Sequence, residues 1–174
     1  MKQEKIIILG PSGSGKDYLR KELINLGLKY SPKITTRPKR INEKDGLDYS
    51  YINNKTFESL TNDGKMKYSE KFIINEQDWW YGISEDNWNN NQIFIMTVGE
   101  FNQINEEDRK NCFVVYLNID KETRKSRLNE RMDNNDSIDR RIEADEQDFS
   151  NFTGYDLSIT DPEFEAVWIY DLMN

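Results

Sequence analysis

The sequence predicts an α/β protein whose core is a parallel β-sheet. A short apolar run at 5–9 is followed by a glycine-rich turn and then by a helix-like segment at 17–26. In the second half of the chain, further apolar strand candidates alternate with helical stretches. This alternating order is typical of α/β folds, in which a helix crosses over from one parallel strand to the next.

The elements at the start of the chain are the clearest. Lys5–Leu9 is a short, largely β-branched run that predicts a buried strand ending at Gly10. Asp17–Leu26 predicts a helix with three leucines on one face and a glycine just beyond its end. The later strand candidates are Ile93–Thr97, Phe113–Leu117 and Leu157–Ile159, and the later helices are Lys121–Arg131, Ile138–Phe149 and Pro162–Leu172. We expect Pro162 in the first helical turn, where its missing amide hydrogen is tolerated.

Residues 31–81 differ from the rest of the chain in composition, because polar, aromatic and basic residues dominate there. Asp45-Gly46 and Asp63-Gly64 are turn signals within it. We therefore expect a β-rich lobe, about 31–81, inserted into a single domain whose core is 1–30 and 82–174. The polar stretch 132–137, flanked by helices that carry arginines, is expected to be a mobile flap.

The composition excludes several kinds of site. The 174 residues include no histidine and one cysteine, which rules out a histidine general base, a zinc site of the usual ligands and an internal disulfide framework. With 24 basic and 32 acidic residues, the net charge of −8 makes a nucleic-acid polymer an unexpected partner. No apolar run approaches the roughly 20 residues of a membrane span, so we expect a cytoplasmic protein with no membrane partner.

The strongest functional signal lies in the turn after the first strand. Gly10-Pro11-Ser12-Gly13-Ser14-Gly15-Lys16 fits the pattern G-x-x-x-x-G-K between a strand and a helix. Glycines let the main chain wrap an anion, the helix start adds partial positive charge, and Lys16 adds a full one. An ordinary glycine-rich turn is the alternative. The candidate phosphate-binding residues are Gly10, Ser12, Gly13, Ser14, Gly15, Lys16 and Asp17.

Asp17 stands where this pattern normally has a serine or threonine that binds Mg²⁺. A carboxylate is also a hard oxygen ligand, so Asp17 is a candidate metal ligand. The alternative is that Asp17 only favours the start of the helix electrostatically.

A second basic run, Thr35-Thr36-Arg37-Pro38-Lys39-Arg40, lies in the predicted lobe. The proline disfavours a helix at Arg37 and keeps the run extended. Two guanidinium groups can clamp a phosphate, although such clusters are more often solvated surface.

These motifs together resemble the guanylate kinase family over residues 6–161. The resemblance rests on GPSGSGK, the TTR run with its second arginine, DG-x-DY from Asp45, YG-x-S from Tyr81, R-L-x-x-R from Arg127, and R-R-I from Arg140. It implies a P-loop kinase with a parallel-sheet core, an inserted β-rich substrate lobe and a helical lid at about 127–141. The implied reaction moves the γ-phosphate of ATP, with Mg²⁺, onto a nucleoside monophosphate, with GMP or dGMP as first choice.

The resemblance also implies roles for particular residues. Arg37, Arg40, Tyr49 and Tyr81 would hold the phosphate of the acceptor, and Lys16, Arg127, Arg131 and Arg141 would be catalytic. Without the resemblance, Arg127 and Arg131 could equally belong to a solvated helix face.

The sequence departs from the family where the family recognises guanine. The altered positions are Lys33, Tyr68 (or Glu70 two places on), Ile83 (with Ser84 next) and the stretch Ile95–Val98, which replaces an Asp-x-Asp element. An insertion at about 74–80 carries Trp79-Trp80, which could stack on a base or pack within the lobe.

Three functions therefore stay open. The first is a nucleoside monophosphate kinase acting on a small-molecule acceptor as a monomer or homodimer. The second is a sugar-phosphate kinase, because GPSGSGKD also resembles the loop of ribose 1,5-bisphosphate phosphokinase. The third is a non-catalytic module that binds a phosphopeptide.

Overall fold

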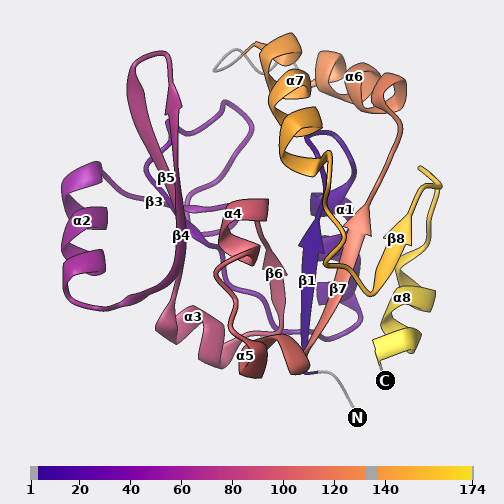
Figure 1. The fold of residues 1–174 in the computed structure, drawn as a ribbon, viewed down its shortest axis with the longest axis horizontal. Helices are drawn as coiled ribbons and strands as arrows, with labels where there is room; N and C mark the ends of the chain where they lie inside the picture. Colours follow the sequence, from indigo (N-terminus) through magenta and orange to yellow (C-terminus); the bar gives the residue numbers. More distant parts are fainter. Residues whose placement is uncertain (1–3, 132–136, 174) are drawn as a thin grey trace.

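The structure is a computed structural model that describes residues 4–131 and 137–173. Its core is a four-stranded sheet in the order β6-β1-β7-β8, built from Ile93–Ile95, Lys5–Leu9, Cys112–Leu117 and Leu157–Ile159. All three strand pairs are parallel, as the alternation of strands and helices predicts. The carboxyl ends of β1 and β7 point toward the helices α6 (Lys121–Glu130) and α7 (Ile138–Phe149) (Figure 1).

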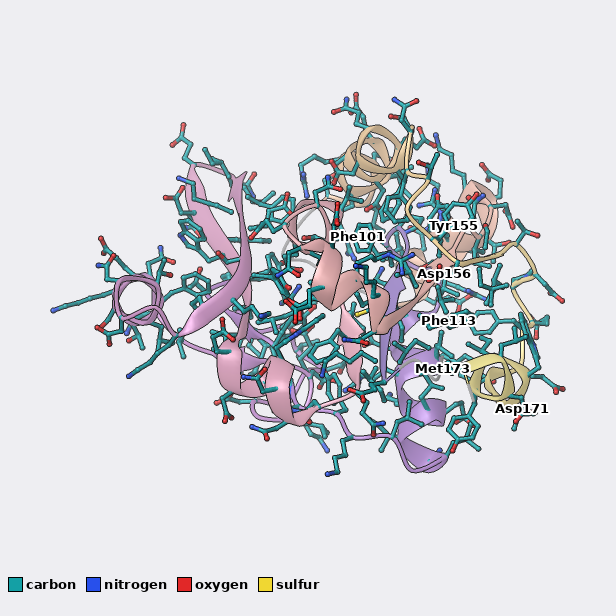
Figure 2. The ribbon with its side chains drawn as sticks, turned by 60° about the horizontal axis from the view of Figure 1, so that its bottom comes forward. Phe101, Phe113, Tyr155, Asp156, Asp171 and Met173 are labelled. Carbon is teal, nitrogen blue, oxygen red and sulfur yellow. The ribbon has the colours of Figure 1, made fainter. Side chains whose placement is uncertain are left out.

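The helices around this sheet are α1 (Lys16–Asn25), α6 (Lys121–Glu130), α7 (Ile138–Phe149) and α8 (Ala166–Met173). Strand β1 is buried on both faces of the sheet, so its side chains pack in two separate hydrophobic clusters. Ile6 and Ile8 pack in a cluster that includes Leu23 of α1, whereas Ile7 and Leu9 pack in a second cluster. Figure 2 shows Met173 on the inner side of α8, where it joins the first cluster.

A second sheet forms the lobe beside the core, in the order β3-β2-β5-β4. Its strands are Ser50–Tyr51, Ile34–Thr35, Gln77–Ser84 and Met66–Ile74, and α2 (Asn54–Asn62) covers it. The long hairpin β4–β5 turns at Asn75 and Glu76, which both adopt positive φ angles of 49° and 63°. This turn is the tip of the insertion seen in the sequence. Helix α2 was not predicted; its Phe57 stacks on Trp80 at 5.2 Å between ring centroids.

Three short helices follow the lobe hairpin: α3 (Glu85–Asn90) leads from β5 to β6, and α4 (Val98–Phe101) and α5 (Glu106–Lys110) lie between β6 and β7. None was predicted, because each is too short to show a helical period. The side chains of Ser84, Thr97 and Asn105 cap their amino termini. Because Thr97 caps α4, strand β6 ends at Ile95 and not at Thr97 as expected.

The prediction that Pro162 opens the last helix is wrong, because α8 begins at Ala166. Asp161 accepts a hydrogen bond from the Glu163 amide, which forms a local turn. The Pro162 carbonyl accepts from Arg127, and Phe164 is buried against the core. These contacts keep residues 161–164 in a non-helical conformation.

Of the flap expected at 132–137, residues 132–136 lie outside the described part of the chain. Within the described ranges, every helix is too short or too polar to cross a lipid bilayer.

The glycine-rich turn packs closely on α6. Gly13 has a φ of +80°, and a Cβ built on it would lie 2.8 Å from the main-chain oxygen of Arg124. Gly46 in the lobe has a similar φ of +76°, but a Cβ there would meet nothing within 4 Å. The turn therefore depends on a glycine for conformation and for contact, whereas Gly46 is needed for conformation alone.

We expect Gly13→Ala to lower the free energy of unfolding by about 2–4 kcal/mol, from backbone strain plus overpacking. Gly46→Ala is the matched control and should cost only about 1–2 kcal/mol, from strain alone. Urea unfolding followed by circular dichroism measures both. Equal losses in the two variants would show that the contact with Arg124 does not constrain the turn.

Candidate active site

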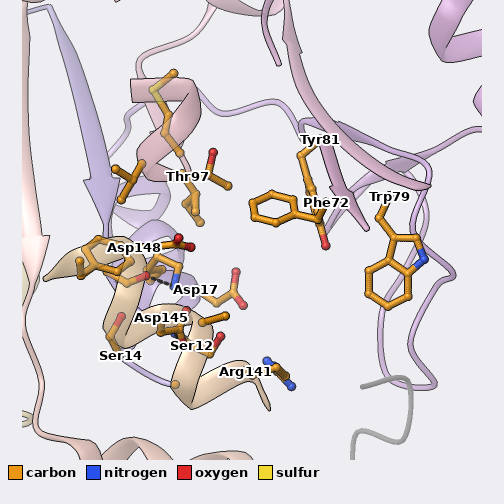
Figure 3. A pocket seen from close by; sticks show the side chains of 18 of the residues that line it. Ser12, Ser14, Asp17, Phe72, Trp79, Tyr81, Thr97, Arg141, Asp145 and Asp148 are labelled. Atoms are coloured by element: carbon orange, nitrogen blue, oxygen red, sulfur yellow. Dashed lines mark hydrogen bonds between the residues drawn. The ribbon is translucent and has the colours of Figure 1, made fainter. Parts of the chain in front are cut away.

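One cavity lies between the glycine-rich turn, the lobe and helix α7. Figure 3 shows Ser12, Asp145 and Asp148 on one side of it and Phe72 and Tyr81 on the other. The cavity is lined from the turn by Gly10 and 12–17, and from the lobe by Arg40, Tyr49, Phe72, Trp79 and Tyr81. Helices α6 and α7 contribute Arg131, Arg140, Arg141, Asp145 and Asp148. Both anion sites predicted from the sequence therefore contribute to one space.

The turn has the geometry of an anion cradle. Gly13 and Gly15 adopt left-handed φ angles of 80° and 101°, so the chain curls before α1 begins at Lys16. The Lys16 ammonium folds back and donates to the carbonyls of Gly10 and Pro11 at 2.6 and 2.8 Å. Burial lowers the pKa of Lys16 to about 8, although Asp145 and Asp17 oppose the shift.

A carboxylate from helix α7 contacts this cradle. The Ser12 amide donates to Asp145 Oδ2 at 2.8 Å, from 133 residues away in the chain. Arg124 Nη1 lies 3.8 Å from the same oxygen. An oxyanion thus satisfies a main-chain donor of the cradle, which shows that this donor points into the cavity and suits negative charge.

On the lobe side, Arg40, Tyr49 and Tyr81 line the cavity, whereas Arg37 lies behind them. Arg37 is 2% exposed, and both its terminal nitrogens donate to Glu43, at 2.9 and 2.8 Å. Its guanidinium also lies over the Tyr49 ring, 5.0 Å from the centroid. Arg37 therefore packs against Tyr49, and it is the Tyr49 side chain that lines the cavity.

Glu43 accepts hydrogen bonds from three groups on the lobe side of the cavity. It accepts from Arg37, from the Arg40 amide and from the Tyr51 hydroxyl. Burial alone would raise the pKa of Glu43, but these hydrogen bonds outweigh it and lower that pKa to about 2. Sequence reasoning missed Glu43, although it stands three residues after Arg40.

Asp17 lies at the mouth of the cradle and also forms an ion pair with Arg20, at 3.6 Å. In the described residues, no three or more acidic, cysteine or histidine side chains come together as a metal site. A Mg²⁺ ion here would need most of its oxygens from phosphates and water, which is how this ion usually binds with nucleotides. Asp17 fits such a site as a single protein ligand.

The predicted lid arginines separate into two groups. Arg127 donates to the carbonyls of Gly13 and Pro162, at 3.3 and 3.0 Å, and so braces the outside of the cradle. Arg131 and Arg141 line the cavity, as does Arg140, which was part of the R-R-I motif but was not singled out. Helix α7 therefore brings two neighbouring guanidinium groups to the same space.

The cavity lining also includes apolar side chains and one member of a buried ion pair. Lys33 lines the cavity and bonds Glu100 at 2.6 Å. Tyr68 turns away and donates to Asp108, and Ile83 is buried in the core. Glu70, the other residue considered at this place, is half-buried; burial raises its pKa, and Glu100 adds to the shift.

Several lining residues were not predicted from the sequence. Asp145 stands four residues after Arg141, so the helical period alone places it on the same face of α7. Phe72 carried no signal, because an aromatic residue in a strand usually belongs to the core. Of the two tryptophans, Trp79 lines the cavity and Trp80 packs within the lobe.

The chain is similar to known proteins over most of its length. A family model described as guanylate kinase matches residues 2–170. The guanylate kinase of Legionella pneumophila (strain Paris) is 31% identical over 170 residues, which cover 91% of this chain and 78% of that protein. The guanylate kinase of Streptococcus mutans is 28% identical over 168 residues, with the same coverage of 91% and 78%.

Among solved structures, a guanylate kinase from Anaplasma phagocytophilum superposes with a TM-score of 0.70. It covers 99% of this chain and 86% of its own, at 19% sequence identity, which supports the fold. With the family model matching nearly the whole chain and a relative above 30% identity, this chain belongs to the guanylate kinase family of nucleoside monophosphate kinases.

Proposed function

We propose that this protein transfers the γ-phosphate of ATP to a nucleoside monophosphate, with GMP or dGMP as the preferred acceptor. The observation that carries the proposal is the single cavity lined by the glycine-rich cradle on one side and by Arg40, Tyr49 and Tyr81 on the other. Phosphoryl transfer needs two anions aligned and their charge balanced, and little covalent chemistry from the protein.

Each side of the cavity has a separate task in this proposal. The cradle and Lys16 hold the β- and γ-phosphates of ATP, and Arg40 with two tyrosine hydroxyls holds the phosphate of the acceptor. Arg131 and Arg141 approach from the lid and balance charge on the phosphoryl group as it moves. Mg²⁺, when bound with ATP, would neutralise phosphate charge, and Asp17 is the residue that would hold it.

The two alternatives have less support. A phosphopeptide module does not need a complete cradle, yet here the glycines and Lys16 form one. A sugar bisphosphate needs cations for a second phosphate, and Lys33, one of the cations that line the cavity, is already neutralised by Glu100. The cytoplasmic location and the monomeric or homodimeric state stay predictions.

An assay of ADP release with ATP and Mg²⁺ tests the proposal. The acceptors are GMP, dGMP, AMP, CMP, UMP, dTMP and ribose 1,5-bisphosphate, with a reaction lacking acceptor as the background. We expect GMP or dGMP to give the highest kcat/KM. Preference for the sugar bisphosphate would replace the proposal with the second function, and no acceptor-dependent ADP would favour the third.

The lowered pKa of Lys16 predicts a proton linkage in ATP binding. With a pKa of about 8, Lys16 is mostly neutral at pH 8.5 before ATP binds. The phosphates stabilise its charged form and raise its pKa, so binding should take up most of a proton at this pH. For the same reason, ATP affinity should fall as the pH rises above 8.

Calorimetry in two buffers of different ionisation enthalpy measures this uptake. Lys16→Arg is the control, because an arginine stays charged throughout this range and should take up no proton. Equal uptake in the variant and the wild type would assign the proton to another group.

The contact between Asp145 and Ser12 predicts competition with ATP. A phosphate at the cradle must displace the Asp145 carboxylate from the amide, because two anions cannot share one donor without repulsion. Asp145→Asn should therefore tighten ATP binding about three- to tenfold, since a neutral acceptor bonds the amide less strongly.

Asp148→Asn is the matched control for this prediction. It removes the same charge from the same cavity, and Asp148 makes no hydrogen bond to the cradle among the described contacts. Calorimetry with ATP, in EDTA and in Mg²⁺, compares the two variants. Equal tightening in both would indicate a general charge effect. Weaker binding for Asp145→Asn only in Mg²⁺ would instead make Asp145 a metal ligand.

A further inference from the structure

A cation is buried in α1, the helix that follows the cradle. Arg20 is 2% exposed and lies one helical turn after Lys16, among the buried residues of the helix together with Leu19 and Leu23. A buried guanidinium costs free energy even when it is paired, and an apolar side chain of similar volume often leaves a protein no less stable. Stability alone is therefore a poor explanation for an arginine at this position.

The guanidinium of Arg20 reaches from the core into the lobe. Its Nη1 donates to the Leu47 carbonyl at 3.2 Å and its Nη2 to Asp48 Oδ1 at 3.4 Å, across 27 and 28 residues of chain. On the core side, the guanidinium carbon lies 4.7 Å from the centroid of the Tyr30 ring, which packs against the first hydrophobic cluster. Arg20 thus joins α1 to residues 44–49, which we call the lobe turn.

Asp48 closes the lobe turn. Its Oδ2 accepts from the Lys44 amide at 2.8 Å, and its own amide donates to the Lys44 carbonyl at 3.0 Å. The Gly46 amide donates to the Tyr49 carbonyl at 2.8 Å. Asp48 therefore uses one carboxylate oxygen within the turn and the other for Arg20, and the turn ends at Tyr49, whose side chain lines the cavity.

A second carboxylate faces the same nitrogen of Arg20. Asp17 Oδ1 lies 3.6 Å from Nη2, so one carboxylate from α1 and one from the lobe turn share this cation. Asp17, Asp48 and Tyr49 also line a small second cavity. Without the guanidinium, the two carboxylates would repel each other. Arg20 therefore sets the spacing between α1 and the lobe turn.

We propose that Arg20 is a positioning residue for the phosphate of the acceptor. It lies outside the described lining of the cavity and acts through Tyr49, because it holds the lobe turn at a fixed distance from the helix that follows the cradle. Phosphoryl transfer is sensitive to such placement, since a shift of about 1 Å can cost about a hundredfold in rate. This inference rests on the proposed kinase activity and on Tyr49 as a ligand of the acceptor phosphate.

Calorimetry of GMP binding, with no ATP present, tests the proposal without turnover. Arg20→Met fills a similar volume but removes the contacts with the lobe turn. We expect Kd for GMP to rise about 5- to 30-fold, as for a hydrogen bond to a charged group that is misplaced but not deleted. Kd for ATP, measured in EDTA, should stay within about threefold of the wild type, because the cradle itself is unchanged.

A double-mutant cycle separates positioning from a general loss of structure. If Arg20 acts through the Tyr49 hydroxyl, Arg20→Met should raise Kd for GMP by at most about twofold in a Tyr49→Phe background. A general loss of structure would instead add its full cost in both backgrounds.

Two further variants complete the design. Arg20→Met with Asp48→Asn removes the carboxylate left without its cation, in case the single variant is unstable, and should still raise Kd for GMP at least about fivefold. Arg109→Met is the matched control, because Arg109 also donates to a carbonyl and a carboxylate, those of Cys112 and Asp156, but both partners belong to the core. Its Kd for GMP should equal that of the wild type. Thermal melts confirm that each variant is folded.

Five results would overturn the inference. Three concern GMP binding by the Arg20 variants: wild-type affinity in Arg20→Met, wild-type affinity in the double variant with Asp48→Asn, or an undiminished effect of Arg20→Met in the Tyr49→Phe background. The fourth is an equal loss in Arg109→Met. The fifth is a loss of ATP affinity as large as that for GMP, which would assign Arg20 to the cradle. Failure of the proposed function looks different, because the wild type itself would then bind no GMP and release no ADP with any acceptor, and the inference would fall with it.

Discussion

The packing of the glycine-rich turn on α6 is the constraint on which the site depends. At Gly13 the turn lies against the main chain of Arg124, and Arg127 of the same helix bonds the Gly13 carbonyl from outside. Arg127 also reaches the Pro162 carbonyl, so one helix joins the cradle to the segment after β8. Because α7 packs on α6, the position of α7 beside the cradle follows from the same contact.

In and around the site, several cationic side chains lie next to a carboxylate. Arg37 pairs with Glu43, Lys33 pairs with Glu100, and Arg124 lies beside Asp145. An excess of acidic residues over the whole chain is therefore compatible with a site for anionic ligands. Each carboxylate fixes a cation in place before a ligand arrives, which lowers the entropy lost on binding.

The sequence predicted those features that depend on residues close together in the chain, and it missed those that depend on contacts between distant residues. The bounds of β1, β8 and α7 follow from their apolar periods and agree with the structure, and the cradle follows from its spacing. The contact of Ser12 with Asp145 spans 133 residues, and that of Lys33 with Glu100 spans 67. No local pattern reports such pairs. Helix α2 and the three short helices were missed because a brief polar helix resembles a loop until its tertiary contacts form.

The long hairpin and the buried ion pair of Lys33 and Glu100 both contribute to the cavity lining. The turn at Asn75 and Glu76 extends β4 and β5, and this extension carries Ile74 and Trp79 into the cavity lining beside Phe72. Lys33 and Glu100 are both buried, so the local dielectric is low and the bond between them is strong. The same low dielectric makes any unmatched donor costly.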